Sequence, residues 1–346
     1  MFFKKDIFIG GLSMRRFWKW HLFIMEYLNM RKQTERGLRP VPAVVPYHRV
    51  LVSDRLRIGR DILALALLIG GLFFFSLLSP IIGGVIDTHV FGRVNPMSGG
   101  TDFTPVYVAG NFVGVAALIP WSMFLQRWLY GVKGATLHSV RSVFRFDVFG
   151  RAMLIIVPIW TVYMVFFNWF SSYNTTEFRV ADLLAIFAVS VLLGPLQSAG
   201  EEYGFRGLVF RIASSWVRNP RASLIVGIAV SSVLFALVHV STDPWFNLYY
   251  LALGIAFATI TWRTGGLENA IVIHAVNNTL AYIFVLILRV EYLTAIDRSA
   301  GMGSKIMLMP CAVLVFVTMI IWFSTRLTGP ERTPQNMASV KAHTTQ

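Results

Sequence analysis

Two adjacent glutamates, Glu201 and Glu202, stand at the end of a long apolar stretch and are followed closely by Arg206. A carboxylate at membrane depth costs roughly 3 kcal/mol on insertion scales, so an acidic pair there is a functional-site hypothesis. On a helix, Glu202 and Arg206 are four residues apart with the acid first, the favourable order for an ion pair. Glu201 is rotated about 100° away. We therefore assign Glu202 and Arg206 to holding the local charge, and predict that Glu201 is free to handle protons.

Two of the seven histidines also lie in apolar stretches. His239 follows Phe235 by one helical turn, and His274 precedes Asn278 by one turn, so each pair shares a helix face. A single histidine in such a place is often only a packing residue, and an acidic pair alone could mark a helix end that reaches water. Together, a glutamate, two imidazoles and an amide on three helices could activate water and stabilise an oxyanion, or could bind a metal ion.

The elements that carry these residues are membrane helices. Of the 346 residues, 55% are hydrophobic and 14% are charged, with a mean hydropathy of +0.62, which excludes a soluble globular protein. A helix needs roughly 20 apolar residues to cross a bilayer. We predict an all-α polytopic membrane protein with about eight transmembrane helices, near residues 61–86, 105–126, 152–171, 182–200, 223–241, 246–262, 267–288 and 306–325.

The distribution of basic residues predicts the orientation of these helices. With both termini in the cytoplasm, 26 of the 31 Lys and Arg residues lie on the cytoplasmic side, where basic residues are retained. Residues 1–60 alone carry 13 of them against 4 acidic residues, which predicts a basic arm that contacts anionic membrane lipid and not nucleic acid. We divide the remainder into N-terminal membrane helices at 61–180, a catalytic core at 181–290, and a last helix with its cytoplasmic tail at 291–346.

Eight simple spans do not bring the candidate residues together. They place Glu201 near the cytoplasmic end of its helix and His239 near the opposite face of the membrane. Residues 203–222, which contain four arginines, could resolve the conflict in two ways. Either the fourth helix continues through Phe210 and takes Glu201 deeper, or the fifth helix starts well inside the membrane after an interfacial segment.

The order of these motifs resembles a known family. Glu-Glu-x-x-x-Arg at 201–206, Phe-x-x-x-His at 235–239 and His-x-x-x-Asn at 274–278 are similar to the CPBP family of intramembrane proteases. This family is also called Abi and includes the endopeptidases that trim prenylated CAAX proteins. The resemblance covers residues 183–290, about a third of the chain. The text around Gly207 and Ser231 is similar to that of bacterial members, which implies a bacterial plasma membrane.

The resemblance implies an intramembrane endopeptidase that hydrolyses a peptide bond of a membrane-associated protein or peptide. Glu201 and His239 match the residues that activate water, and His274 and Asn278 match those that stabilise the oxyanion. Glu202, Arg206 and Phe235 match supporting positions.

Family members are commonly described as metalloproteases, so one divalent ion, zinc first, is expected on Glu201, His239 and His274. A metal-free mechanism with glutamate as base stays open. The alternative function is a non-catalytic immunity or regulatory protein on the same scaffold. A proton-coupled transporter is disfavoured because no inverted repeat is visible.

Overall fold

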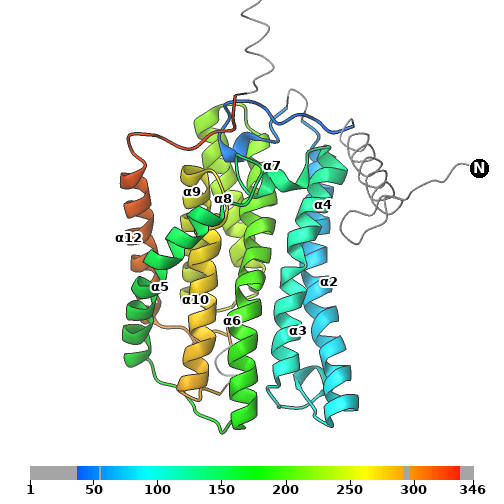
Figure 1. The fold of residues 1–346 in the computed structure, drawn as a ribbon, viewed down its shortest axis with the longest axis vertical. Helices are drawn as coiled ribbons and strands as arrows, with labels where there is room; N and C mark the ends of the chain where they lie inside the picture. The colour runs from blue at the N-terminus through cyan, green and yellow to red at the C-terminus, as the bar shows by residue number, and fades with distance from the viewer. Residues whose placement is uncertain (1–36, 54–55, 292–296, 336–346) are drawn as a thin grey trace, which may run out of the picture.

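The computed structural model describes residues 37–53, 56–291 and 297–335, so most of the predicted basic arm lies outside the described residues. Within them, eight helical segments are long and apolar enough to cross a membrane, which confirms the predicted all-α fold (Figure 1). The segments are α2 (Ile58–Phe91), α3 with α4 (Pro105–Ala116 and Leu118–Tyr130), α5 (Phe146–Trp169), α6 joined to α7 by a π-helix (Val180–Glu202, Tyr203–Val209 and Phe210–Ser215), α8 (Pro220–Leu237), α9 (Pro244–Thr264), α10 (Glu268–Ile287) and α12 (Leu308–Ser324), which follows the short helix Lys305–Met307.

Three of these helices begin with the same local signal, a polar residue followed by proline. The side chains of Thr104, Asn219 and Asp243 each accept a hydrogen bond from the first turn of α3, α8 and α9. The proline that follows each cap has no N–H group, so the first turn has one fewer unpaired donor. Asp243, four residues after His239, thereby fixes the start of α9.

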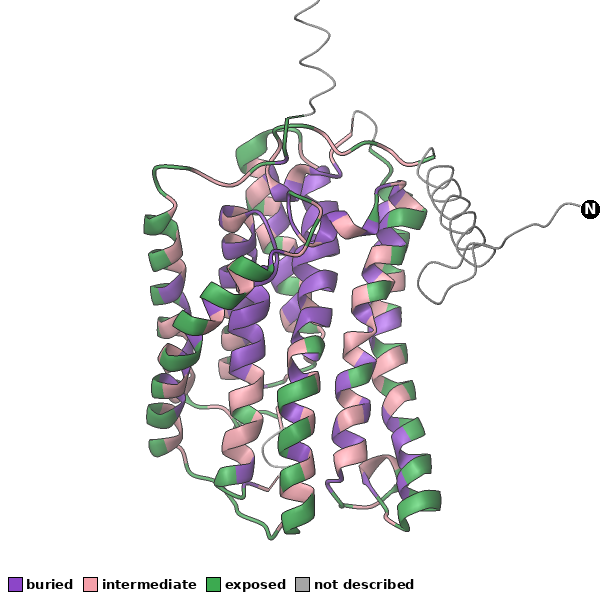
Figure 2. Cartoon of the chain, in the orientation of Figure 1, coloured by how far each residue is buried: buried purple, intermediate pink, exposed green. Residues whose placement is uncertain are grey.

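The helices form an inner and an outer set. In Figure 1, α6 and α10 run through the centre of the bundle, with α12 at one flank and α2 at the other. In α10, 50% of the residues in its apolar 18-residue stretch are buried, compared with 17% in the corresponding stretch of the span that ends with α12. Figure 2 shows that the buried residues gather in the upper half of the central helices. Large side chains such as Phe74 on α2 and Phe316 on α12 are exposed, as expected where a helix faces lipid.

The fourth span resolves the conflict over depth. The helix that begins at Val180 does not stop at Glu202, and runs through the π-helix to Ser215. Glu201 is therefore 14 residues from the end of this span, or about 21 Å at 1.5 Å per residue. The first of the two predicted alternatives, continuation through Phe210, is confirmed.

The predicted end of the fifth span at residue 241 is wrong. Helix α8 ends at Leu237, and His239 lies in the turn that follows. Val240 has a φ of +49°, which breaks the helix, and the next residues bind residue 298: the Thr242 N–H and the Ser241 hydroxyl both donate to the Arg298 carbonyl oxygen. Tertiary hydrogen bonds thus end a stretch whose apolar character favours a longer helix.

Two glycines allow the site helices to approach their neighbours closely. A Cβ atom on Gly200 would lie 2.2 Å from the carbonyl oxygen of Val115, where α6 crosses the end of α3. A Cβ atom on Gly254 would lie 2.6 Å from the Cα atom of Ser232, where α9 crosses α8. Small residues are characteristic of such contacts because helix association in lipid depends on close van der Waals packing. Gly200 thus presses α6 against α3 one residue before Glu201.

Candidate active site

Glu202 is the buried centre of the candidate site. Its side chain is 0% exposed, and its Oε1 atom accepts a hydrogen bond from Arg206 Nη1 at 3.1 Å. The same oxygen lies 2.7 Å from Nδ1 of His274, on α10. An ionised carboxylate only accepts, so Nδ1 of His274 carries the proton of that bond. Glu202 therefore joins the helix that contains the acidic pair to the helix that contains His274.

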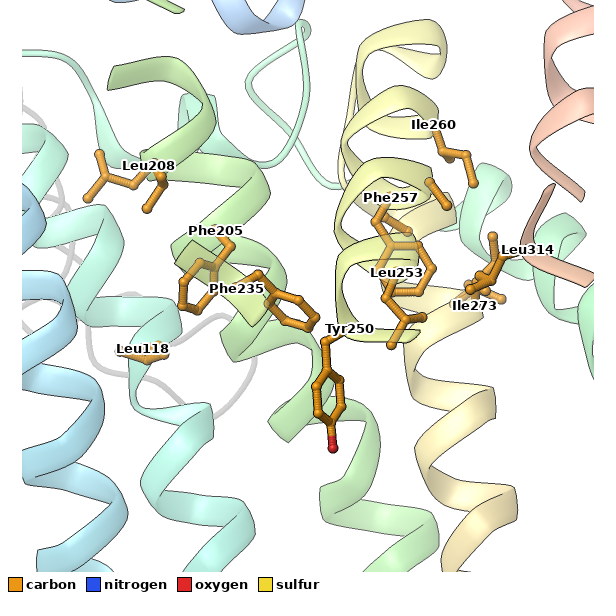
Figure 3. Close-up of a cluster of buried hydrophobic side chains, with 14 of the residues drawn as sticks. Leu118, Phe205, Leu208, Phe235, Tyr250, Leu253, Phe257, Ile260, Ile273 and Leu314 are labelled. Carbon is orange, nitrogen blue, oxygen red and sulfur yellow. The ribbon is translucent and has the colours of Figure 1, made fainter. Parts of the chain in front are cut away.

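The Arg206 guanidinium lies on aromatic rings. Its central carbon is 3.8 Å from the ring centroid of Phe235 and 5.2 Å from that of Phe257. Figure 3 shows Phe205, Phe235, Tyr250 and Phe257 within one cluster of buried side chains. The faces of these rings attract a cation in a place where water is excluded. Phe235 thus lies against the charge that faces Glu202.

Glu201 points to a different set of partners. Its Oε1 atom accepts a hydrogen bond from Gln197, one helical turn earlier on α6. Its Oε2 atom has no hydrogen-bond partner and lies 3.7 Å from Nε2 of His274. The Glu201 side chain is 14% exposed, whereas that of Glu202 is 0% exposed. Each glutamate therefore has one bonded oxygen and one oxygen without a partner, and the two differ in that only Glu201 is partly exposed.

Gln197 links Glu201 to Asn278. The Gln197 Oε1 atom accepts a hydrogen bond from Asn278 Nδ2 at 3.0 Å and one from the Ser198 hydroxyl at 3.2 Å. Asn278 in turn accepts a hydrogen bond from Asn277 at 3.1 Å. Gln197 was missed by the sequence reasoning, although a polar residue four positions before Glu201 on an apolar helix is a readable signal.

Asn277 is a second residue that the sequence reasoning missed. Its Oδ1 atom accepts hydrogen bonds from Trp160 Nε1 on α5 and from the Tyr249 hydroxyl on α9, both at 3.1 Å. These bonds fix the rotation of α10 from two sides. Since Asn277 is adjacent to Asn278, the same bonds set the direction in which the Asn278 amide points.

His239 approaches the site from the turn after α8. Its Nδ1 atom lies 2.7 Å from the carbonyl oxygen of Phe235, so Nδ1 is the donor and Nε2 carries the free lone pair. The imidazole stacks on the Tyr250 ring with centroids 3.9 Å apart. The rings of His239 and His274 lie 4.7 and 6.0 Å from that of Phe235. The two predicted histidines are therefore held around one aromatic ring, and the hydrogen bond that His239 makes is to Phe235 and not to Glu201.

The π-helix lies directly after the acidic pair. All seven of its residues, Tyr203–Val209, are buried. A π-helical turn is rare and is found mostly at functional sites, because it changes the rotation between the residues before and after it. Here it separates Glu202 from Phe210 and places Arg206 within the turn itself. The sequence gives no local signal for this turn.

The predicted metal ligands are Glu201, His239 and His274. Each histidine has Nδ1 bound to an acceptor, Glu202 or the Phe235 carbonyl, which is the arrangement that orients a histidine ligand toward a metal. Among the described residues, however, no three His, Cys, Asp or Glu side chains are grouped so that they could hold a metal ion. Glu201, His239 and His274 do not form a three-ligand site in this structure, so we derive no catalytic step through a metal.

These features define a class of protein: an integral membrane protein whose described residues include eight membrane-length helical segments and a buried site of carboxylates, imidazoles and amides. Residues 180–280 match the family model described as type II CAAX prenyl endopeptidase Rce1-like. This part of the chain is similar to the CPBP, or CAAX protease, family, which supports the resemblance predicted from the sequence. The match includes every predicted site residue.

The chain is also similar to a bacterial protein. YyaK, an uncharacterized protein of Bacillus subtilis strain 168, is 29% identical over 116 residues. The aligned part is 33% of this chain and 39% of YyaK, so the match spans well under half of either protein. No solved structure matches the chain. The family match therefore supports a CAAX-protease-like function in general, and the reaction and substrate belong to the proposal below.

Proposed function

We propose that this protein is an intramembrane endopeptidase that hydrolyses a peptide bond of a membrane-associated protein or peptide. The observation that carries the proposal is that Glu201, the partly exposed member of the acidic pair, has an Oε2 atom without a hydrogen-bond partner 3.7 Å from His274 Nε2. A carboxylate held on one oxygen and free on the other is suited to accept a proton from water.

Water is activated by Glu201 in this proposal. Glu201 Oε2 takes one proton of the water as the water oxygen attacks the substrate carbonyl. Glu201 then returns that proton to the leaving amine. His239 orients the same water, because its Nδ1–H group is donated to Phe235 and its Nε2 lone pair is left to accept the second water hydrogen. General-base catalysis of this kind contributes about 10²- to 10⁴-fold in rate.

The negative charge that develops on the carbonyl oxygen is stabilised by His274 and Asn278. Asn278 donates one N–H of its amide to Gln197, and its second N–H is available to an oxyanion. His274 already donates Nδ1–H to Glu202, so Nε2 must also carry a proton if it is to donate.

The metal predicted from the sequence is kept as a second version of the proposal. His239, His274 and Glu201 are the residues that would hold a divalent ion, zinc first, and since they do not form a three-ligand site as they stand, they would have to move to bind it; the ion would supply Lewis-acid chemistry. The two versions differ in metal content. Purified protein with about one metal per chain, and loss of both metal and activity with a chelator, would support the metal version. Activity of metal-free protein would support glutamate acting alone.

The test compares variants on a defined probe. Full-length protein in liposomes is incubated with internally quenched peptides that carry a C-terminal alkyl anchor. We expect wild-type cleavage of at least one peptide, and an approximately 10²- to 10⁴-fold loss in Glu201→Gln and His239→Ala. Arg289→Gln is the control, since Arg289 is half exposed and is paired with the exposed Glu177.

Equal cleavage by Glu201→Gln at wild-type protein level would contradict the proposal. If both variants also keep the full cellular effect of the protein, that effect does not depend on hydrolysis. The non-catalytic immunity or regulatory function would then account for it.

A further inference from the structure

Residues 298–303 are bound along residues 241–243, directly after His239. The Arg298 carbonyl oxygen accepts hydrogen bonds from the Thr242 N–H at 3.1 Å and the Ser241 hydroxyl at 3.0 Å. The N–H groups of Gly301 and Gly303 donate to Asp243 Oδ2 at 3.0 and 3.1 Å. We call residues 298–303 the clamp. The clamp fixes the backbone of residues 241–243, which joins His239 to the start of α9.

The clamp depends on a close approach that only glycine permits. A Cβ atom on Gly303 would lie 2.3 Å from Asp243 Oδ1, and Gly301 has a φ of +92°. Both positions exclude ordinary side chains for steric reasons. The position of Arg298 relative to α9 is therefore set by backbone contacts on both sides of it, and its side chain is directed from a fixed origin.

The Arg298 side chain reaches the ring that stacks on His239. Arg298 Nε donates to the Tyr250 hydroxyl, and the guanidinium carbon lies 5.8 Å from the Tyr250 ring centroid. Tyr250 is 6% exposed, and its ring lies 3.9 Å from that of His239 with an interplanar angle of 23°. Arg298 therefore holds the Tyr250 ring at its hydroxyl, and the orientation of this ring sets the plane of the His239 imidazole that stacks on it.

One hydrogen bond does not fix the direction of His239 Nε2. The bond from Nδ1 to the Phe235 carbonyl oxygen leaves the imidazole free to tilt about that bond, and His239 lies in a turn beyond the end of α8. Packing on both faces is needed to fix the tilt. Phe235 meets the imidazole at a steep angle, 64°, and Tyr250 lies flat against it.

We infer that Arg298 is a positioning residue for His239 and acts through Tyr250. The guanidinium holds the Tyr250 hydroxyl, the Tyr250 ring holds the imidazole plane, and the imidazole then presents Nε2 to the reacting water. This inference rests on the proposed function for its catalytic consequence, although the arrangement of the three side chains can be tested without a substrate.

The first test measures the reactivity of His239 in the absence of substrate. Full-length protein in detergent is treated with diethylpyrocarbonate, which modifies neutral imidazoles, and the rate at each histidine is followed by peptide mass spectrometry. We expect Tyr250→Phe and Arg298→Gln to change the rate at His239 and to leave the rates at His138 and His274 as in the wild type. Arg289→Gln is the control and changes none of them.

The second test uses the anchored peptide that the wild type cleaves fastest. Tyr250→Phe and Arg298→Gln are each expected to lower kcat about tenfold with KM unchanged, because a small misplacement of a catalytic group costs up to about 100-fold. The double variant should be no worse than either single one, since both remove the same contact. Arg298→Lys should recover part of the loss, because an ammonium group can still donate to the hydroxyl.

The outcomes separate this inference from the proposed function. Unchanged His239 reactivity and unchanged kcat in both single variants would overturn the inference and leave the proposed function standing. Additive losses in the double variant would also overturn it, because Arg298 and Tyr250 would then act independently. If the wild type cleaves no peptide, the proposed function fails, and the modification rates alone decide whether Arg298 positions His239.

Discussion

Two clusters of charge among the described residues are built differently. The closed cluster contains Arg145, Glu268 and Glu331, and the open cluster contains Glu201, Glu202, Arg206 and His274. In the closed cluster, both oxygens of Glu268 accept hydrogen bonds from Arg145, at 2.9, 3.0 and 2.7 Å. Arg145 also donates to Thr264 and to Glu331, so each of its guanidinium nitrogens has a partner.

The open cluster leaves polar atoms without partners. Oε2 of Glu201, Oε2 of Glu202, and Nε and Nη2 of Arg206 are buried and make no hydrogen bond. A buried unpaired polar group costs about 1–3 kcal/mol. The closed cluster stabilises the fold, because all of its hydrogen bonds join segments of the chain. The open cluster keeps atoms that a water or a substrate can bind, which is the difference expected of a reaction site.

The largest expected effect is on stability, and it comes from the closed cluster. Glu268→Gln leaves Arg145 buried beside a neutral partner, and removing one member of a buried ion pair costs about 3–5 kcal/mol. Glu201→Gln removes a charge that only Gln197 holds by a hydrogen bond, so we expect a free energy of unfolding equal to or above that of the wild type. Thermal unfolding of both variants in one detergent measures the difference. An equal fall in Tm would show that the two clusters do not differ in this way.

Glu202 should combine both effects, because it is the member of the open cluster that has two partners. Glu202→Gln leaves Arg206 buried beside a neutral partner and weakens the bond to His274, with an expected loss of about 3–5 kcal/mol in stability. A double variant, Glu202→Leu with Arg206→Met, replaces the buried ion pair by apolar groups and should recover much of that stability. It should not recover cleavage, since His274 has lost the carboxylate that orients it. Recovery of cleavage in the double variant would contradict the role given to Glu202.

Local interactions in the site could be predicted from the sequence. The Glu202–Arg206 pair follows from helical spacing, and the spans follow from the number of apolar residues that a bilayer requires. The contact between Glu202 and His274 joins positions 72 residues apart and has no local signal. The same is true of Arg298, whose contact with Tyr250 depends on the clamp.

The ends of the helices were the hardest feature to predict. The fourth span continues through a π-helix whose residues are all buried, so its stability depends on packing against neighbouring helices and not on its own sequence. The fifth span ends early because residues 241–243 bind the clamp. In both places a distant segment decides where a helix ends, and the hydropathy of the stretch itself gives no indication of that segment.

Gln197 tests whether the open cluster needs its hydrogen-bonded support. Gln197→Leu removes the donor to Glu201 and the acceptor for Asn278 while keeping a side chain of similar size. We expect about a tenfold loss of cleavage, which corresponds to one hydrogen bond to a charged group, about 1.5 kcal/mol. Asn111→Leu is the matched control, because the Asn111 amide donates to Tyr107 within its own helix. Equal activity of the two variants would remove Gln197 from the site.

The smallest effect concerns His48, which lies in the short helix Tyr47–Arg49 outside the membrane helices. Burial, with the charges of Arg49 and Arg211, lowers the pKa of His48 to about 3. In the unfolded chain His48 is protonated below about pH 6.5, whereas in the folded protein it stays neutral there. The free energy of unfolding therefore falls as the pH drops below about 6.5.

His48→Phe keeps the stack on Phe210, whose ring lies 5.5 Å away, and removes the two ring nitrogens that have no partner. The variant should lose less stability than the wild type between pH 7 and pH 5, measured as the change in Tm. His89→Phe controls for the loss of an imidazole, because His89 is exposed at the end of α2. An equal fall in Tm between pH 7 and pH 5 in His48→Phe and in the wild type would show that another group determines the acid sensitivity. The segment around His48 would then tolerate charge as readily as the open cluster does.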